Sequence, residues 1–254
     1  MGPQQDHRKS LAFRQMRRRP QTGGRRGSSR DPFVLYEDDA VVVLDKPAGL
    51  PAVPIKGSDT PSAWSILSAH LKLKRQRAFV VHRIDRFTSG AMAFAKTERD
   101  RDALVRQFLA HTPKRQYLAV VRGRLPNNEG TLVHYFRRQG MFQELSTASD
   151  QQAARAELRY RVERALVGAS LVRVTLVTGL QNQVRVQFSA IGNPVVGDRK
   201  YHQAESAERR IARVALHAVH LEFTHPRSGE TVSVESEPPA DFQSLVRGLS
   251  PRAR

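Results

Sequence analysis

The sequence predicts an α+β fold in which helices flank a mixed, mainly antiparallel β-sheet. Short apolar runs, bounded by turn residues, recur through the middle of the chain. Two amphipathic helical segments interrupt these runs, and strands and helices do not alternate regularly, as they would in a doubly wound parallel fold. A chain of 254 residues is long enough for one large domain, and no internal repeat divides it.

The expected strands are runs in which β-branched and aromatic residues dominate and which end at Gly, Pro, Asp, Ser or Thr. Strands fill most of the middle of the chain, and two more close the fold near its end. The predicted strands are residues 33–36, 40–44, 79–84, 91–95, 116–121, 156–162 and 171–177, with closing strands over 214–223 and 231–234.

Two segments carry helix signals, and a third helix is expected to begin near Gln183. The first segment, residues 62–73, follows Thr60 and Pro61, a typical helix start. The second, residues 98–111, begins with a pattern that resembles a capping box, formed by Thr97 and Asp100. It also has an apolar stripe at helical spacing. The stripe consists of Leu104, Val105, Phe108 and Leu109.

The two ends of the chain differ from its middle. Residues 1–30 contain nine Lys and Arg residues against one acid, Asp6, and few apolar residues. We predict a disordered basic arm there, which either seeks phosphates or only solubilises the chain. Residues 31–246 form the expected catalytic domain, and residues 247–254 form a basic C-terminal tail.

The composition limits the kinds of partner and chemistry. The formal net charge is +18, from 42 Lys and Arg against 24 Asp and Glu. This charge favours a polyanion, although it does not distinguish RNA from DNA or anionic lipid. Without cysteine the chain has no disulfide and no thiolate metal site. No apolar run is long enough to span a membrane or to act as a secretory signal, so we expect a cytoplasmic protein.

Residues 82–90, which read His-Arg-Ile-Asp-Arg-Phe-Thr-Ser-Gly, are the most informative segment. Asp85 lies between Arg83 and Arg86, after an apolar run and before a polar turn. A turn at the end of a strand can present such a carboxylate to a ligand. The alternative is that Asp85 only bonds its own turn, as aspartates often do.

This nonapeptide closely resembles the catalytic signature of the RluA-type pseudouridine synthases, which isomerise uridine within RNA. Three further segments resemble that family in the same order along the chain, so that the likeness covers about residues 33–235. They are Val42 to Leu50, with a Lys-Pro-x-Gly turn; Lys114 to Gly123, similar to a Lys-x-Tyr strand; and Thr178 to Tyr201, with Thr178-Gly179, Gln183-Val184-Arg185 and Gly197-Asp198.

The resemblance implies the family's fold and assigns three catalytic residues. Asp85 matches the catalytic aspartate, which acts as nucleophile or base, and Arg185 matches the arginine that pairs with it. A buried aspartate needs such a cation to stay ionised, because burial alone raises its pKa. Tyr117 matches the tyrosine that lies over the uracil. The alternatives are a surface helix residue for Arg185 and a core aromatic for Tyr117. No cofactor is required, and no metal site is expected at His217, His220 and His225.

A second group of residues is expected to contact RNA. Arg83 matches an arginine that fills the gap left by a flipped nucleotide, although it alternatively pairs with Asp85 or contacts a phosphate. Phe87 offers a ring for stacking. Leu180 and Asn182 depart from the pattern, which usually has Arg and His there, and these departures bear on substrate and activity. The predicted RNA-binding residues are Arg83, Arg86, Phe87, Asn182, Gln183 and Lys46.

The sequence therefore predicts an enzyme that isomerises specific uridines in structured RNA, either ribosomal or transfer RNA, after flipping the nucleotide out of its helix. We expect a monomer without membrane or metal partners. A protein that keeps the fold and binds RNA but has lost turnover is the main alternative. A basic DNA-binding module is a third, but the sequence shows no recognition helix with clustered base-reading residues.

Overall fold

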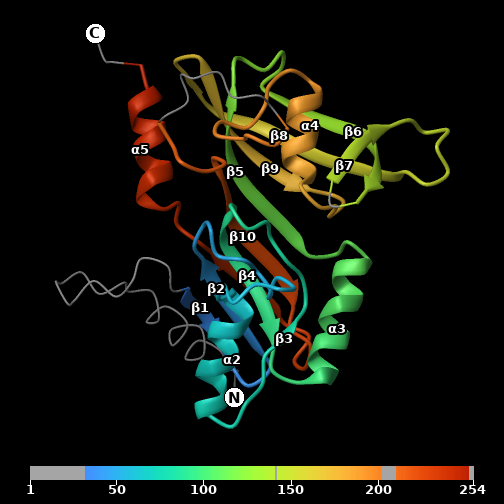
Figure 1. The fold of residues 1–254 in the computed structure, drawn as a ribbon, viewed down its shortest axis with the longest axis vertical. Coiled ribbons are helices and arrows are strands. Elements are labelled where there is room, and N and C mark those ends of the chain that lie inside the picture. Colours follow the sequence, from blue (N-terminus) through green and yellow to red (C-terminus); the bar gives the residue numbers. More distant parts are fainter. Residues whose placement is uncertain (1–31, 141, 202–209, 252–254) are drawn as a thin grey trace, which may run out of the picture.

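The computed structural model describes residues 32–140, 142–201 and 210–251. Eleven strands form one twisted sheet that runs through the whole molecule (Figure 1). Its main strand order is β1-β2-β4-β10-β5-β9-β8-β6-β7, with β11 paired to β10 and β3 to β4. Between the described strands only β10 and β4 pair in parallel. The mixed, mainly antiparallel sheet that the sequence predicts is therefore confirmed.

The lower part of the molecule in Figure 1 contains the first half of the chain and its two longest helices. Helix α2 packs on one face of the β2–β4 pair, through Leu67 and Leu71 against Leu44 and Phe94. The core on the other face contains Leu104 of α3. The elements are β1 (Phe33–Glu37), β2 (Val41–Lys46), α2 (Ala63–Leu73), β3 (Phe79–Val80), β4 (Ser89–Ala95) and α3 (Glu98–Leu109).

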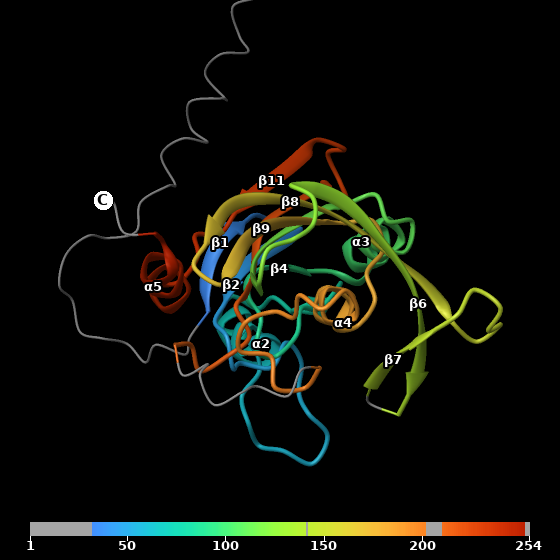
Figure 2. The ribbon, with the colours of Figure 1, turned by 90° about the horizontal axis from the view of Figure 1, so that it is seen from above.

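The upper part contains the largest core, which includes residues of β5, β8, β9 and β10 together with helices α4 and α5. Strand β6 forms a hairpin with β7 and pairs antiparallel with β8, and the β6–β7 hairpin projects to one side (Figure 2). The elements from β5 onward are β5 (Lys114–Arg122), β6 (Glu129–Gln139), β7 (Phe142–Ser146), β8 (Ala154–Leu166), β9 (Ala169–Leu176), α4 (Gln183–Ala190), β10 (Leu216–Thr224), β11 (Thr231–Glu235) and α5 (Ala240–Leu249). Of these, β11 packs through Val232 and Val234 in the lower core with α3.

Both predicted helix starts are present. Ser62 caps α2, where its side chain and that of Ser65 form a reciprocal capping box. Thr97 caps α3, since its side chain accepts a hydrogen bond from the backbone N–H of Asp100. A helix also begins at Gln183, as predicted.

Four elements differ from the prediction. Strand β3 ends at Val80, so the chain approaches Asp85 without regular structure. Strands β6 and β7 were not predicted, because β6 is half exposed and mixes charged residues with apolar ones. Helix α5 also escaped prediction. It buries Phe242, Leu245 and Leu249, so the packed chain continues past the boundary predicted at residue 246.

The predicted basic arm, residues 1–30, lies outside the described residues, as do residues 252–254 of the predicted tail. Within the described part, no helix is both long and apolar enough to cross a membrane.

Candidate active site

Asp85 lies in the turn that connects β3 to β4. The turn is closed by a backbone hydrogen bond, 3.1 Å long, from Thr88 N to Asp85 O. The carboxylate of Asp85 makes no hydrogen bond to this turn or to any other described residue, so the purely local role does not hold. It lines a cavity of about 510 Å³, and its side chain is 21% exposed. A cavity of this size can accept a nucleotide-sized ligand.

Lys46 fixes the position of the Asp85 turn. Its side chain is fully buried, and Nζ donates to the carbonyls of Pro47, Leu50 and Arg86 at 3.0, 2.8 and 3.1 Å. Burial lowers the pKa of Lys46 to about 7. The sequence predicted that Lys46 contacts RNA, but an amine enclosed by three carbonyls cannot reach it. Its position indicates that it holds the Asp85 turn against the turn that follows β2.

Arg185, on the first turn of α4, stands between two acids. Its Nη1 is 3.9 Å from Oδ2 of Asp85, within ion-pair distance. The much closer partner is Asp198, whose two carboxylate oxygens accept from Nε and Nη2 at 2.7 Å each. Asn182 Oδ1 accepts from Nη1 at 2.9 Å. Arg185 is therefore near Asp85, as predicted, but it is bound mainly to Asp198, which the sequence analysis did not single out.

This sharing changes the acidity of Asp85. Burial raises the pKa of Asp85, while the charges of Arg185, Arg83 and Lys46 act in the opposite direction without cancelling that increase. In contrast, the two hydrogen bonds from Arg185 help to lower the pKa of Asp198, although burial opposes them. A buried carboxylate with a raised pKa and unfilled acceptors is more basic than a saturated one, which suits a group that must take up a proton or attack an electrophile.

Tyr117, in the middle of β5, lines the same cavity. Its strand pairs with β10 opposite Ala218 and with β9 opposite Val174. Burial raises the pKa of Tyr117 to about 12, and the negative charge of Asp85 also raises it, whereas Arg115 lowers it. At neutral pH the phenol therefore keeps its proton and can donate a hydrogen bond into the cavity.

Asn182 and Gln183 line the cavity at the start of α4, and their side chains form hydrogen bonds within the protein. Asn182 adopts a left-handed conformation, with φ of 55°, which Asn tolerates better than most residues. Its amide nitrogen donates to Tyr201. Gln183 is 2% exposed and bonds Thr178 and the backbone of Leu180. Both had been predicted to bind RNA; instead they hold the start of α4 and, through Asn182, the Arg185 guanidinium.

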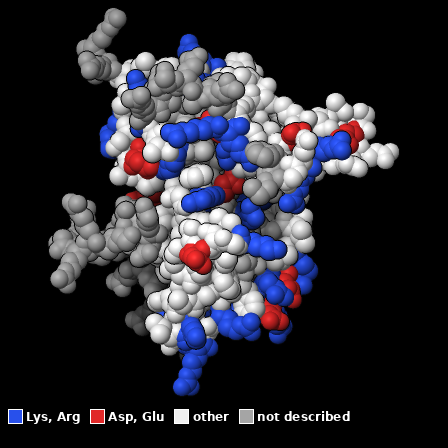
Figure 3. Space-filling model, in the orientation of Figure 1, with Lys and Arg blue, Asp and Glu red and all other residues white. Residues whose placement is uncertain are grey.

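The other predicted RNA contacts lie on the surface near Asp85. Arg83 is exposed and reaches the edge of the cavity. Phe87 is 47% exposed, and the guanidinium of Arg86 lies 5.4 Å from the centre of its ring. Figure 3 shows Lys and Arg side chains gathered across the middle of one face of the molecule. Such a surface suits a polyanion.

Sequence reasoning also missed residues that hold Arg185 or line the cavity. Asp198 and Tyr201 belong to a segment that had been matched to the family as a motif, without a role for either residue. The Arg185 guanidinium lies 5.1 Å from the centre of the Tyr201 ring. Arg115 lines the cavity two residues before Tyr117 on β5, and the predicted Lys-x-Tyr strand drew no attention to it.

No group of three or more His, Cys, Asp or Glu within the described ranges could hold a metal ion. His217 is buried, with one ring nitrogen 2.9 Å from Ser89 Oγ and the other 3.0 Å from the carbonyl of Ser236. Burial lowers its pKa to about 4, so this ring is neutral and part of the core.

The Asp85 carboxylate and the Tyr117 phenol line one cavity, the Arg185 guanidinium lies within ion-pair distance of Asp85, and the exposed Arg83 and Arg86 lie beside the same turn. This combination is typical of an enzyme that acts on a nucleic acid.

Comparison with known proteins identifies the family. Residues 40–190 match the family described as RNA pseudouridylate synthase, and the chain belongs to that family. Its activity is the isomerisation of uridine in RNA to pseudouridine. The predicted fold and reaction are therefore confirmed.

Named relatives agree with this assignment. The chain is 35% identical to ribosomal large subunit pseudouridine synthase D of Zymomonas mobilis, over 85% of this chain and 72% of that protein. It is 38% identical to the protein of the same name in Xanthomonas campestris, over 85% and 69%. The match to the Nitrosomonas europaea protein is 35% identical and spans 64% of its length, so these relatives extend beyond the matched region.

A solved structure shares the fold. Human RNA pseudouridylate synthase domain containing 1 superposes with a TM-score of 0.71 at 25% identity, covering 90% of this chain and 92% of the human chain.

Proposed function

We propose that this chain converts specific uridines in the RNA of the large ribosomal subunit to pseudouridine, with Asp85 as the catalytic acid residue. The observation that carries the proposal is that Asp85, Tyr117 and Arg185 line or border one cavity although they are far apart in sequence. The choice of ribosomal RNA over transfer RNA rests on the names of the relatives, several of which are ribosomal large subunit synthases.

The reaction breaks the bond from uracil N1 to ribose C1′ and forms a new bond from C5 to C1′. N1 gains the proton that C5 loses, so substrate and product have the same composition. Asp85 acts on the ribose, as a nucleophile toward C1′ or as the base that takes a ribose proton. Both roles require an ionised carboxylate with free acceptors. Burial raises the pKa of Asp85, and the charge of Arg185 opposes this rise without occupying the acceptors of the carboxylate by a close pair.

Arg185 and Tyr117 have separate tasks in this scheme. Arg185 keeps Asp85 charged without neutralising it by a close pair, because its Nε–Nη2 edge is bound to Asp198. Tyr117 stays protonated at neutral pH and donates a hydrogen bond to the uracil while the base turns. The cavity walls keep the detached base from leaving before the second bond forms.

The target uridine must leave its helix to enter the cavity, which costs on the order of a few kcal/mol of stacking and pairing. Two exposed residues next to Asp85 can offset this cost. Arg83 at the cavity edge is placed to occupy the gap in the RNA, and the exposed ring of Phe87 is placed to stack on a base.

The positions that depart from the family pattern do not favour an inactive protein. Asn182 keeps a polar contact with Arg185, at 2.9 Å. Leu180 packs on the apolar cluster around Phe136 and Val186, and it also lines the cavity. Neither substitution removes a group that the proposed mechanism uses.

The deciding experiment maps pseudouridine at single-nucleotide resolution after incubating the protein with unmodified ribosomal and transfer RNA transcripts. We expect product at few positions, in the large-subunit ribosomal RNA, and none with Asp85→Ala. Product confined to transfer RNA would overturn the substrate, and RNA binding without product would overturn the activity. We further expect a cytoplasmic monomer whose basic arm, residues 1–30, assists RNA binding.

A further inference from the structure

Arg115 is a cation of the cavity wall whose Nε and Nη2 atoms have no hydrogen-bond partner among the described residues. It lies on β5 two residues before Tyr117 and therefore on the same face of the strand. The residue is 8% exposed and lines the cavity together with Asp85. Its Nε and Nη2 atoms are buried, and neither has a hydrogen-bond acceptor among the described residues.

Three other arginines show what this pair of nitrogens is suited to bind. Nε and Nη2 form one edge of the guanidinium, and each of the three grips both oxygens of a carboxylate with it. The lengths of these bonds lie between 2.6 and 3.0 Å. The pairs are Arg185 with Asp198, Arg213 with Asp241, and Arg227 with Asp100. In Arg115 the same edge has no hydrogen-bond acceptor among the described residues.

The surroundings of Arg115 do not compensate its charge. The nearest ring is that of Phe108, with its centre 5.9 Å from the guanidinium carbon. Burial lowers the pKa of Arg115, and only the Tyr117 phenol opposes that effect. A buried guanidinium without an acceptor is costly in the free protein, so its presence in a ligand cavity indicates that the ligand supplies the acceptor.

We propose that Arg115 binds a phosphate of the RNA in this cavity, through its Nε–Nη2 edge. The inference rests on the proposed function, since it takes the nucleotide in the cavity to be part of an RNA chain. A phosphate presents two charged oxygens to a planar edge, as the three carboxylates do, whereas a uracil carbonyl is a single neutral acceptor. Leu180, which lines the same cavity, is apolar and offers no charge to a phosphate. Arg115 supplies the positive charge in this part of the wall.

Gly179 leaves room for the guanidinium. A Cβ at this position would lie 2.2 Å from Nη1 of Arg115. Because both free nitrogens are covered by the cavity wall, binding requires the guanidinium to rotate toward the cavity. No hydrogen bond within the described chain holds Nε or Nη2 in place, and Gly179 has no side chain beside Nη1.

The first test compares Arg115→Met with the wild type, using unmodified large-subunit ribosomal RNA transcripts. In the free protein the variant should melt at the same temperature or higher, since it removes an uncompensated charge. We expect KM to rise about tenfold or more with little change in kcat. The slope of log affinity against log salt concentration should fall by about 0.7, which corresponds to one lost phosphate contact.

Two further variants protect the test against misfolding. Gly179→Ala keeps Arg115 but displaces its guanidinium, and it should raise KM in the same direction. Arg115→Lys keeps a charge without the planar edge and should restore the salt slope but only part of the affinity. Arg247→Met, at an exposed position of α5, is the matched control and should change neither the salt slope nor KM.

A lower melting temperature with an unchanged salt slope in Arg115→Met would overturn the proposal and make Arg115 a structural residue. A loss of kcat/KM without a change in salt slope would also overturn it, in favour of contact with a neutral group. If the wild type makes no pseudouridine, the proposed function fails. The salt slope of RNA binding, measured without turnover, then decides the role of Arg115 independently.

Discussion

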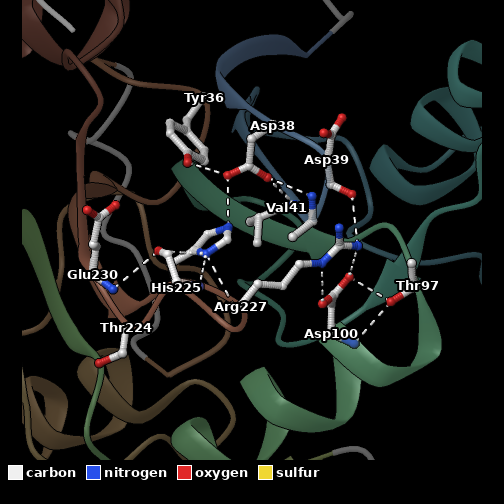
Figure 4. A network of polar contacts seen from close by, with 12 residues as sticks. Tyr36, Asp38, Asp39, Val41, Thr97, Asp100, Thr224, His225, Arg227 and Glu230 are labelled. Carbon is white, nitrogen blue, oxygen red and sulfur yellow. Dashed lines mark hydrogen bonds and ion pairs between the residues drawn. The ribbon is translucent and has the colours of Figure 1, made fainter. Parts of the chain in front are cut away.

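Two polar networks of this protein contain the same kinds of side chain but differ in their purpose. One only holds elements together, and the other leaves a carboxylate available to a ligand. The cleft network joins α4 to the Asp85 turn, and the turn network, drawn in Figure 4, ties the loop after β10 to the first strands and to α3. The cleft network consists of Asp85, Asn182, Arg185 and Asp198, and the turn network consists of Tyr36, Asp38, Asp100, His225 and Arg227.

In the turn network each acid is saturated with donors. Asp100 accepts from Arg227 Nε and Nη2 at 3.0 and 2.7 Å and from Thr97 Oγ1 at 2.6 Å. Asp38 accepts from the backbone N–H of Ala40 at 2.7 Å and from the Tyr36 hydroxyl, and His225 Nε2 is 3.0 Å away. The pKa values of both carboxyls are lowered. These bonds hold elements together and leave no acceptor for a ligand.

In the cleft network only one of the two acids is saturated. Asp198 takes both hydrogen bonds of the Arg185 edge, whereas Asp85 is 3.9 Å from the same guanidinium and has a raised pKa. The difference shows that an arginine can bind one acid firmly and hold a second one near it in a reactive state. Of the four carboxyls in the two networks, Asp85 is the one left for chemistry.

The largest expected effect is that of Asp85→Asn. If Asp85 is the acid that acts on the ribose, this variant should lower kcat by at least about 10³-fold, because an amide neither attacks nor takes up the proton. Its RNA affinity should stay within about threefold of the wild type. Single-turnover product formation and filter binding measure the two quantities. Retention of more than a tenth of the wild-type rate would remove Asp85 from the mechanism.

Removing Arg185 should reduce kcat nearly as much, but the single variant Arg185→Leu is a poor test. It leaves Asp198 buried and charged without its partner, which costs about 3–5 kcal/mol and endangers the fold. The double variant Arg185→Leu with Asp198→Asn removes both charges. We expect it to fold, to bind RNA and to lose about 10²-fold or more in kcat, because Asp85 loses its cation. Full activity of a folded double variant would contradict the role of Arg185.

The sequence allowed prediction of the part of this site that lies within short motifs. Asp85, Arg185 and Tyr117 were predicted from residue order, and the structure places Asp85 and Tyr117 in the wall of one cavity, with Arg185 within ion-pair distance of Asp85. The competition of Asp198 for Arg185 could not be predicted, because it depends on how the chain after α4 folds back. Lys46 was misjudged for a related reason, since only the fold shows that carbonyls from two turns surround its amine.

The fold was predicted where periodicity was strong and missed where it was weak. The capped, amphipathic α3 was predicted nearly to its ends. Strand β6 lacks a clear alternation of apolar and polar residues because much of its surface is exposed. Helix α5 is short, and its helical pattern was not recognised in the sequence. Their stability comes from pairing and packing with distant strands, which a local pattern does not record.

A smaller effect, a shift of the pH profile with a modest loss of kcat, is expected for Asp198→Asn. The neutral amide no longer competes for Arg185, so the guanidinium acts more fully on Asp85 and lowers the pKa of that carboxyl. Activity requires the Asp85 anion, so it falls as pH drops through this pKa, and the acid limb of the kcat profile should move to lower pH in the variant. We expect about a tenfold lower kcat at neutral pH, because the carboxylate becomes less basic. A limb that stays in place or moves to higher pH would show that Asp198 does not control Asp85.

The smallest effect on activity is expected for Asp100→Asn, although this variant removes a bidentate arginine pair like that of Asp198. Asp100 is 2% exposed, so the loss of its charged hydrogen bonds should cost about 2 kcal/mol of stability. For a domain of this size that corresponds to a melting temperature about 4–8 °C lower. Since the folded-state pKa of Asp100 is lowered, its contribution is present above the unfolded value of about 3.9 and is lost as pH falls through the folded-state pKa. The stability difference from the wild type should therefore disappear in acid, while kcat and KM at neutral pH stay unchanged. A change in kcat at neutral pH would mean that the turn network reaches the active site and that the separation of the two networks is wrong.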